Sequence, residues 1–256
     1  MSDIQTLGSL QEVLDLVGPH PVLTLDIGDG FRAPAYAARS VTGWTVAFHR
    51  RSDHGIRGSA VIGTAEGLSA LLADAEVRGW VTGGGNRHLS VPRGTIDVVQ
   101  ARLDLGTRGG DWDWLWTTAA PEEVVGEHLV APLPPGCRDE TQAFLDEHSP
   151  RTHGQPFARP SQHWVAVREP LDDSLVAIGC SEPGAAGTPT LAGIAVARER
   201  RGEGWGAAVT AHLTRRGVQS HGACVLGMFA DNAPARGLYH RLGFRTGMEW
   251  TSRWFG

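Results

Sequence analysis

The sequence contains no lysine, so its 23 residues of the Lys and Arg class are all arginines. A Schiff base needs a lysine amine, and so does the phosphate loop of P-loop enzymes, so both kinds of mechanism are excluded. Cysteine is scarce as well: Cys137, Cys180 and Cys224 have no C-x-x-C spacing. This set does not suggest a disulfide framework, and we expect the three residues to fill the core.

Long apolar runs and a surplus of positive charge are also missing. No run of about eighteen apolar residues could cross a membrane, and the N-terminus begins with a polar, acidic stretch instead of a signal sequence. The formal charge of -5 disfavours nucleic-acid binding, which needs clustered positive charge. We therefore expect a cytoplasmic protein without a membrane or nucleic-acid partner.

The 256 residues, 41 % of them hydrophobic, suffice for one large domain or two of ordinary size. In the first part, Ser9 with Glu12 three residues later indicates a capped helix, and Thr64 precedes a second helical pattern. Strands are predicted at residues 22–25, 44–49, 88–91 and 112–116. In the last of these, alternation places Trp112, Trp114 and Trp116 on one face, either in the core or as an aromatic wall facing a substrate.

Four prolines between residues 119 and 136 mark the predicted domain boundary, so we divide the chain into 1–118 and 119–256. The short run 127–131 is a further candidate strand. Beyond it the patterns predict a helix over 139–147, strands at 164–168, 175–180 and 190–196, a helix over 204–216, a strand at 223–230, a helix over 232–241 and a strand from 244. This order predicts an α/β fold with a mixed (α+β) sheet.

The residues that indicate a ligand site lie where the apolar strand ending at Val196 leads into a glycine-rich helix start. Gly202, Gly204 and Gly206 alternate there. Such glycines let the backbone approach a ligand, and the unpaired N–H groups and dipole of the helix favour an anion such as a pyrophosphate. The residues also fit the dinucleotide fingerprint G-x-G-x-x-A. Only about fifty residues follow, however, too few to bind a second nucleotide.

This segment resembles the GCN5-related N-acetyltransferase (GNAT) family. Val196, Arg201, Gly204 and Gly206 match the family's strand ending in V and its R/Q-x-x-G-x-G/A motif. The family's ending N-x-x-A-x-x-L-Y-x-x-x-G-F is matched by Asn232, Ala235, Leu238, Tyr239, Gly243 and Phe244. The resemblance covers about residues 120–256 and is strongest over 190–244, although Arg198 stands where the family often has proline.

The resemblance implies an acetyl-CoA-dependent N-acetyltransferase with a small-molecule or peptide amine as its acceptor. It implies that Tyr239 protonates the departing thiolate. The residues implied to contact coenzyme A are Ile194, Ala195 and Val196 along the pantetheine arm, Arg201, Gly202, Glu203, Gly204, Trp205, Gly206 and Ala207 at the pyrophosphate, and Asn232 and Ala235 at the arm again. Because the histidines lack metal-ligand spacing, we expect no metal.

The general base stays open. An alkylamine is almost fully protonated at pH 7, yet residues 190–196 contain no acid. Glu182, Asp231 and His163 are the candidates, and a structural role is an equally good interpretation of each.

The donor, the activity and the oligomeric state stay open as well. The donor is either acetyl-CoA or a carrier of a longer acyl or aminoacyl group. The protein is either an enzyme or a coenzyme sensor without turnover, and either a monomer or a homodimer. Residues 1–118 are interpreted as an α/β domain of unknown role or a degenerate copy of the same fold.

Overall fold

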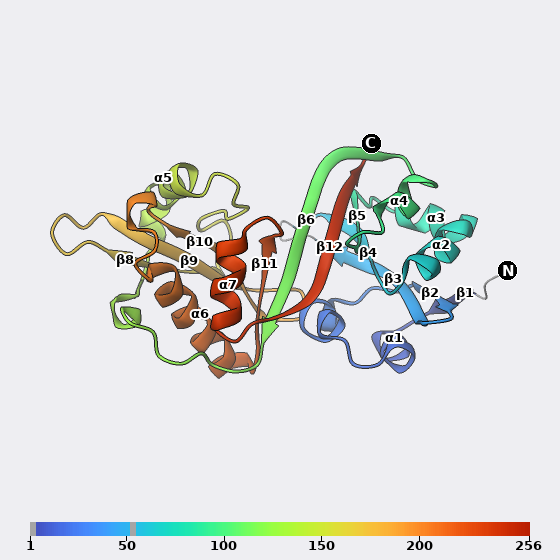
Figure 1. The fold of residues 1–256 in the computed structure, drawn as a ribbon, viewed down its shortest axis with the longest axis horizontal. Coiled ribbons are helices and arrows are strands. Elements are labelled where there is room, and N and C mark those ends of the chain that lie inside the picture. The colour runs from blue at the N-terminus through green and yellow to red at the C-terminus, as the bar shows by residue number, and fades with distance from the viewer. Residues whose placement is uncertain (1–3, 52–54) are drawn as a thin grey trace. The chain divides into compact units, whose positions relative to one another are not determined.

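The computed structural model describes residues 4–51 and 55–256, which divide into two compact units (Figure 1). The first unit runs to Trp114 and also includes Met228–Asn232 and Thr246–Gly256. The second contains Leu115–Gly227 and Ala233–Arg245. The chain therefore returns to its first unit for its last strand. Among the described residues, no helix is long and apolar enough to cross a membrane.

The first unit begins with the predicted caps. Ser9 Oγ accepts the N–H of Glu12 at 3.2 Å, and Thr64 Oγ1 accepts the N–H of Gly67 at 3.1 Å, so both predicted helices are confirmed. The elements of this unit are β1 (Ile4–Leu7), α1 (Leu10–Val17), η1 (Val22–Ile27), η2 (Gly28–Gly30), β2 (Ala35–Ser40), β3 (Gly43–Arg51), β4 (Arg57–Ile62), α2 (Ala65–Ala73), α3 (Ala75–Thr82), β5 (His88–Pro92), α4 (Ile96–Gln100), most of β6 (Leu105–Thr117) and most of β12 (Arg245–Phe255).

Two predicted strands are wrong. Residues 22–25 lie in the helical turn η1, because Pro21 provides a helical φ of -60° before it and His20 Nδ1 accepts the N–H of Val22 at 3.3 Å. Residues 127–131 form a 3₁₀ turn, η3 (Glu127–Leu129), and only the start of a short strand, β7 (Ala131–Pro132). In both places a local turn determines the conformation of a short apolar run.

The second unit contains the other predicted elements. Besides η3 and β7, the elements of this unit are η4 (Pro135–Cys137), α5 (Arg138–His148), β8 (His163–Arg168), β9 (Leu175–Pro183), β10 (Pro189–Val196), η5 (Arg198–Arg200), α6 (Trp205–His221), most of β11 (Cys224–Phe229) and α7 (Ala233–Arg241). The predicted helices and strands from residue 139 onward are all present, with ends that differ by a few residues.

Both units follow the same order of elements. In the first unit β1 to β4 form an antiparallel ladder, and β5 then pairs parallel to β4 after a helical crossover. In the second unit β7 to β10 form an antiparallel ladder, and β11 then pairs parallel to β10 after α6. The fold is thus the predicted mixed α/β sheet architecture. The last strand, β12, pairs antiparallel with β5 of the first unit.

Two helices cover opposite faces of the strands of the second unit (Figure 1). Phe144 and Leu145 of α5 pack with Ile178 and Cys180 of β9 on one face. On the other face, a Cβ at Gly179 would touch Val209 of α6 at 2.6 Å, so the helix lies directly on the strand there. The alternation of side chains along β9 thus separates the two faces.

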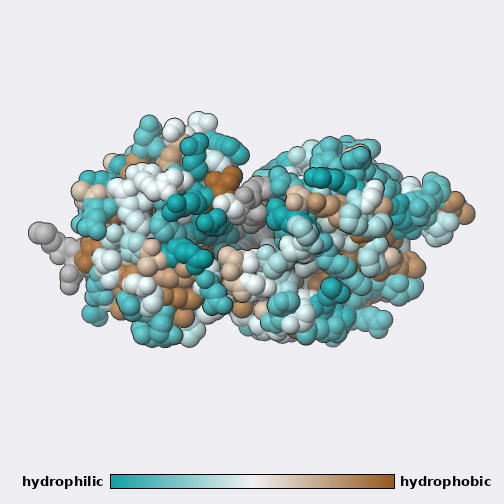
Figure 2. All heavy atoms as spheres, turned by 180° about the vertical axis from the view of Figure 1, so that it is seen from behind, coloured by the Kyte–Doolittle hydropathy of each residue, from teal (hydrophilic) through white to brown (hydrophobic). Residues whose placement is uncertain are grey.

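The three cysteines, and two of the tryptophans whose role the sequence left open, are wholly or partly buried. Cys180 and Cys224 are buried, as expected, and Cys137 is half-buried. Trp114 is 2 % exposed, and Trp112 stacks on Trp250 with ring centroids 6.0 Å apart. Core packing therefore accounts for these two tryptophans. Polar and intermediate residues make up most of the surface drawn in Figure 2.

Candidate active site

β10, the predicted coenzyme strand, is irregular at its centre. Its register with β9 shifts between Ala192 and Ala195. Gly193 lies in this bulge with φ 61°, a conformation that glycine adopts without strain. A Cβ at position 193 would lie 2.6 Å from Cη2 of Trp164, so the indole ring packs against the bulge. The bulge is therefore supported by a buried aromatic side chain.

The other edge of β10 is open beyond its first residues. Within the described part of the chain, the parallel register with β11 covers only Thr190 and Leu191 of β10. Residues 194–196, the predicted contacts of the pantetheine arm, lie past this paired stretch. An extended ligand with amide groups can add to such an edge as a short extra strand.

The helix start after β10 has the backbone geometry that an anion site needs. Gly202 and Gly204 have φ values of 85° and 95°, which turn the backbone into α6. The first hydrogen bond of the helix joins the N–H of Ala208 to the carbonyl of Gly204 at 3.0 Å. The N–H groups of residues 204–207 donate no hydrogen bond within the described residues. Four free donors at the positive end of a 17-residue helix suit a pyrophosphate.

His148, the last residue of α5, accepts two hydrogen bonds from this turn. Arg201 Nη2 donates to the carbonyl oxygen of His148 at 2.6 Å, and the N–H of Arg198 donates to His148 Nδ1 at 3.3 Å. The guanidinium of Arg201 therefore makes a bond to the backbone of α5. No local pattern signals this role of His148, because 50 residues separate it from Arg198.

An acidic side chain lies beside the same turn. The carboxylate of Glu203 accepts hydrogen bonds from Trp205 Nε1 at 3.0 Å and from Arg200 Nε at 2.9 Å. These bonds lower the pKa of Glu203. Arg200 also pairs with Glu169. Because two carboxylates share the charge of Arg200, this side chain offers little free positive charge at the turn.

Tyr239 of α7 follows the residue through which this helix contacts the start of α6. A Cβ at Gly206 of α6 would lie 3.4 Å from Val196 of β10 and 3.6 Å from Leu238 of α7. The next residue, Tyr239, is 8 % exposed and its hydroxyl makes no hydrogen bond with any described residue. Burial raises the pKa of Tyr239 to about 12. The phenol is therefore protonated at neutral pH and has its donor available.

The candidate bases lie in three separate places. Glu182, at the end of β9, accepts two hydrogen bonds from Arg159 at 2.6 and 2.7 Å. His163 begins β8, and its pKa is lowered by burial first and then by Arg216 and His212. Asp231 lies in the turn between β11 and α7, with Asn232, in a stretch that packs in the first unit. Ala235 follows in α7. Within the described ranges no three His, Cys, Asp or Glu side chains are grouped as metal ligands.

The corresponding helix start of the first unit is closed. Only Gly63 and Thr64 connect β4 to α2, and the side chain of Thr64 itself caps the helix. Thr45 fills the remaining space, because a Cβ at Gly67 would overlap its Oγ1. This turn therefore offers no open anion site like that of α6.

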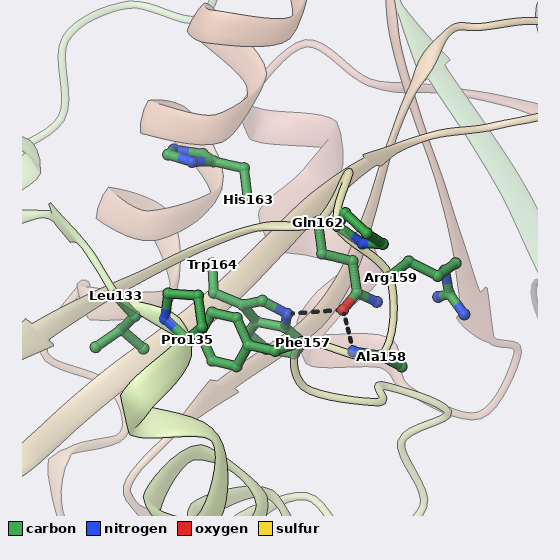
Figure 3. Close-up of a pocket in the computed structure, with 9 residues that line it drawn as sticks. Leu133, Pro135, Phe157, Ala158, Arg159, Gln162, His163 and Trp164 are labelled. Atoms are coloured by element: carbon green, nitrogen blue, oxygen red, sulfur yellow. Dashed lines mark hydrogen bonds between the residues drawn. The ribbon is translucent and has the colours of Figure 1, made fainter.

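A pocket of about 360 Å³ lies beside the bulge in the second unit (Figure 3). Its walls come from the segment before α5, the loop between α5 and β8, and β8 itself. The lining residues are Leu133, Pro135, Phe157, Ala158, Arg159, Pro160, Gln162, His163 and Trp164. Sequence reasoning did not identify this pocket, because its walls come from segments that meet only in the folded chain.

Comparisons with known proteins relate part of this chain to a known family. The sequence model of the acetyltransferase (GNAT) family matches residues 128–244. No curated protein matches the chain by sequence. Among solved structures, a GCN5-related N-acetyltransferase from Kribbella flavida is 17 % identical with a TM-score of 0.51, over 82 % of this chain and 86 % of that one.

Two further structures are similar over nearly the whole chain. A GCN5-related N-acetyltransferase from Sphaerobacter thermophilus is 15 % identical with a TM-score of 0.52, over 96 % of this chain and 84 % of that one. A GCN5-related N-acetyltransferase-like protein from Streptococcus suis is 12 % identical with a TM-score of 0.54, over 96 % and 98 %. At this identity the likeness shows the fold. The family match itself identifies residues 128–244 as a domain of the GNAT acetyltransferase family.

Proposed function

We propose that this domain transfers an acetyl group from acetyl-CoA to a primary amine of a small molecule or peptide. One arrangement carries the proposal: the four free N–H groups of residues 204–207 follow the open edge of β10, and α7, the helix that carries the buried Tyr239, packs against the same helix start through Leu238. The free N–H groups suit the pyrophosphate, the open strand edge suits the pantetheine amides, and the phenol suits the sulfur.

The acetyl group passes directly from the thioester to the amine, and each bond that forms is matched by one that breaks. The neutral amine nitrogen attacks the thioester carbonyl carbon, so that a C–N bond forms and a tetrahedral intermediate results. The C–S bond then breaks, and the thiolate takes a proton from the hydroxyl of Tyr239. The nitrogen loses one proton to a base or to water, and Tyr239 regains its proton from solvent. Glu182, Asp231 and His163 remain the proposed candidates for the base.

Calorimetric titration with acetyl-CoA and with desulfo-CoA tests the coenzyme site. We expect both to bind the wild-type protein. Gly204→Asp adds a carboxylate where phosphate would lie, while aspartate tolerates the left-handed backbone better than most residues. This variant should weaken both ligands by tenfold or more. Binding of neither ligand to the wild-type protein would refute the proposal.

Tyr239→Phe tests turnover separately from binding. The variant should lower the rate of acetyl transfer at least tenfold and leave the affinity for acetyl-CoA nearly unchanged, because only the hydroxyl is removed. An unchanged rate would remove Tyr239 from the chemistry. A protein that binds acetyl-CoA but releases no thiol with any amine would instead be a coenzyme sensor, and a panel of acyl and aminoacyl donors would reveal a longer donor.

A further inference from the structure

The pocket of Figure 3 shares one wall with the bulge of β10. That wall is the indole of Trp164, whose Cη2 would be 2.6 Å from a Cβ at Gly193. The pocket therefore borders the buried indole that supports the bulge, and the bulge precedes the open strand edge. The volume, about 360 Å³, is at the lower end of the range for small-molecule sites.

The pocket walls are mainly apolar and aromatic. Figure 3 shows the side chains of Leu133, Pro135, Phe157 and Trp164 gathered together, whereas His163 lies apart toward α6. The rings of Phe157 and Trp164 are 6.0 Å apart at 41°. Such walls favour a ligand with an aromatic or branched aliphatic group.

The charge at the rim of this pocket is already balanced. Arg159 is the charged residue among the described lining residues, and both carboxylate oxygens of Glu182 pair with it. No carboxylate belongs to the lining itself. A polycationic acceptor would need several free acids, so the pocket does not suit one.

Gln162 adds an oriented donor. Its Oε1 accepts the N–H of Ala158 at 2.9 Å and the indole N–H of Trp164 at 3.3 Å. Because two N–H donors must meet an acceptor, the amide orientation is fixed with its oxygen toward them. The NH₂ group makes no hydrogen bond with the described residues. It is left to donate to an oxygen of a ligand, such as a carbonyl.

Phe157 is held in an unusual backbone conformation. Its φ is 52°, a region that bulky side chains rarely occupy and that costs about 1–2 kcal/mol. Strained residues of this kind cluster at ligand sites, where the surroundings hold a side chain in place. Here the strained residue is the one that carries the second aromatic wall.

We propose that this pocket binds the acceptor, and that the acceptor is an α-amine with an apolar or aromatic side chain and a neighbouring carbonyl. The inference rests on the proposed acetyl transfer. The apolar group packs against the half-buried Phe157, whose ring contacts Trp164, and the carbonyl accepts from Gln162. An α-amine has a pKa of about 8, so it is partly neutral at pH 7.5 and depends less on a base than an alkylamine does. That property suits a pocket without a carboxylate in its lining, whose Arg159 is paired with Glu182.

Four amines separate the features of this acceptor: phenylalanine amide, glycine amide without the ring, 2-phenylethylamine without the carbonyl, and spermidine as a polycation. With acetyl-CoA at pH 7.5, kcat/KM for phenylalanine amide should exceed each of the others at least tenfold. A preference for spermidine, or equal rates for the two amides, would overturn the inference and leave acetyl transfer intact.

Two variants test the walls one at a time. Phe157→Gly removes the ring and relieves the positive φ, so it should fold and should lower kcat/KM for phenylalanine amide about tenfold without affecting glycine amide. Gln162→Glu keeps the acceptor for Ala158 and Trp164 but loses the donor, so it should weaken both amides and spare 2-phenylethylamine. Leu171→Ala, 99 % exposed, is the matched control and should change nothing. Equal effects of Phe157→Gly on all four amines would contradict the assigned wall.

A binding measurement keeps this inference separate from the proposed function. Saturation-transfer NMR should detect phenylalanine amide on the wild-type protein with desulfo-CoA present, and the signal should disappear in Phe157→Gly. If acetyl-CoA and desulfo-CoA fail to bind, acetyl transfer is refuted. The same NMR experiment without coenzyme still shows whether the pocket binds phenylalanine amide. If the coenzyme binds and the amide gives no signal, the pocket is not the acceptor site and the inference is refuted.

Discussion

The indole ring of Trp164 fills the space that a side chain at position 193 would need, because a Cβ on Gly193 would lie 2.6 Å from Cη2. The two residues belong to β8 and β10, with β9 between them. In the strand register, Cys180 of β9 is opposite both Trp164 and Ala192. The ring thus contacts both the bulge and the pocket. A substitution of Trp164 or Gly193 should therefore change the bulge as well as the pocket wall.

Gly193→Ala should destabilise the fold by about 2–4 kcal/mol, from the positive φ and from the overlap with Trp164. Gly187→Ala is a matched control, because Gly187 also has a positive φ of 77° but nothing lies within 4 Å of its Cβ position. It should lose only about 1 kcal/mol. Urea unfolding of both variants measures the difference. Equal losses would mean that the indole moves away without cost.

The pKa of Tyr239, about 12, predicts a pH dependence of stability. The folded pKa lies above the usual value near 10, so the unfolded chain loses this proton first as the pH rises. The stability that this group contributes is complete below pH 10 and is lost between pH 10 and 12. Thermal unfolding across pH 8 to 11 should show a steeper decline for the wild-type protein than for Tyr239→Phe. Parallel declines would show that the hydroxyl is not buried in solution.

Glu203→Gln should strengthen coenzyme binding a few-fold at low salt. The carboxylate of Glu203 stands beside the free N–H groups of the helix start and repels a phosphate, and the amide does not. Because the side chain is exposed, salt screens the repulsion, and the gain should shrink from 20 mM to 500 mM NaCl. Titration with acetyl-CoA at both salt concentrations measures it. A gain that is independent of salt would point to a change in loop structure instead.

Glu127→Gln should destabilise the second unit by about 1–3 kcal/mol at pH 7. Glu127 is 8 % exposed and accepts two hydrogen bonds from Arg215, at 2.9 and 3.1 Å. Burial alone would raise the pKa of Glu127, but Arg215 and the N–H of Val124 outweigh it and lower the pKa. The stability from this pair is therefore present above the unfolded pKa near 4.5 and lost as the pH falls below it.

Glu140→Gln is the control for this ion pair. Glu140 also binds an arginine, Arg168, at 2.8 and 2.6 Å, but its side chain is 44 % exposed. An exposed pair contributes at most about 1 kcal/mol, so this variant should lose less than Glu127→Gln in urea unfolding at pH 7. A larger loss for Glu140→Gln would contradict the ranking by burial.

The helices and strands from residue 139 onward could be predicted because their signals are local. Caps, apolar periodicity and alternating glycines act over a few residues, and they place Gly204 at the start of α6 and Tyr239 in α7. The predictions failed where a neighbouring side chain determined the turn, as His20 does before Val22. β1, β2, β4, α3 and α4 were not predicted, because their short patterns are weak without the strands beside them.

The sequence by itself determined the family resemblance, the coenzyme turn and the candidate residues, since these depend on spacing along the chain. Only the tertiary structure decided that Trp164 supports Gly193, that Arg159 pairs with Glu182, that Phe157 and Gln162 line a pocket, and that the last strand packs in the first unit. Contacts of this kind join residues that are tens to more than a hundred positions apart. They arise from strand register and from side chains that meet across a sheet, and no local pattern encodes either of these.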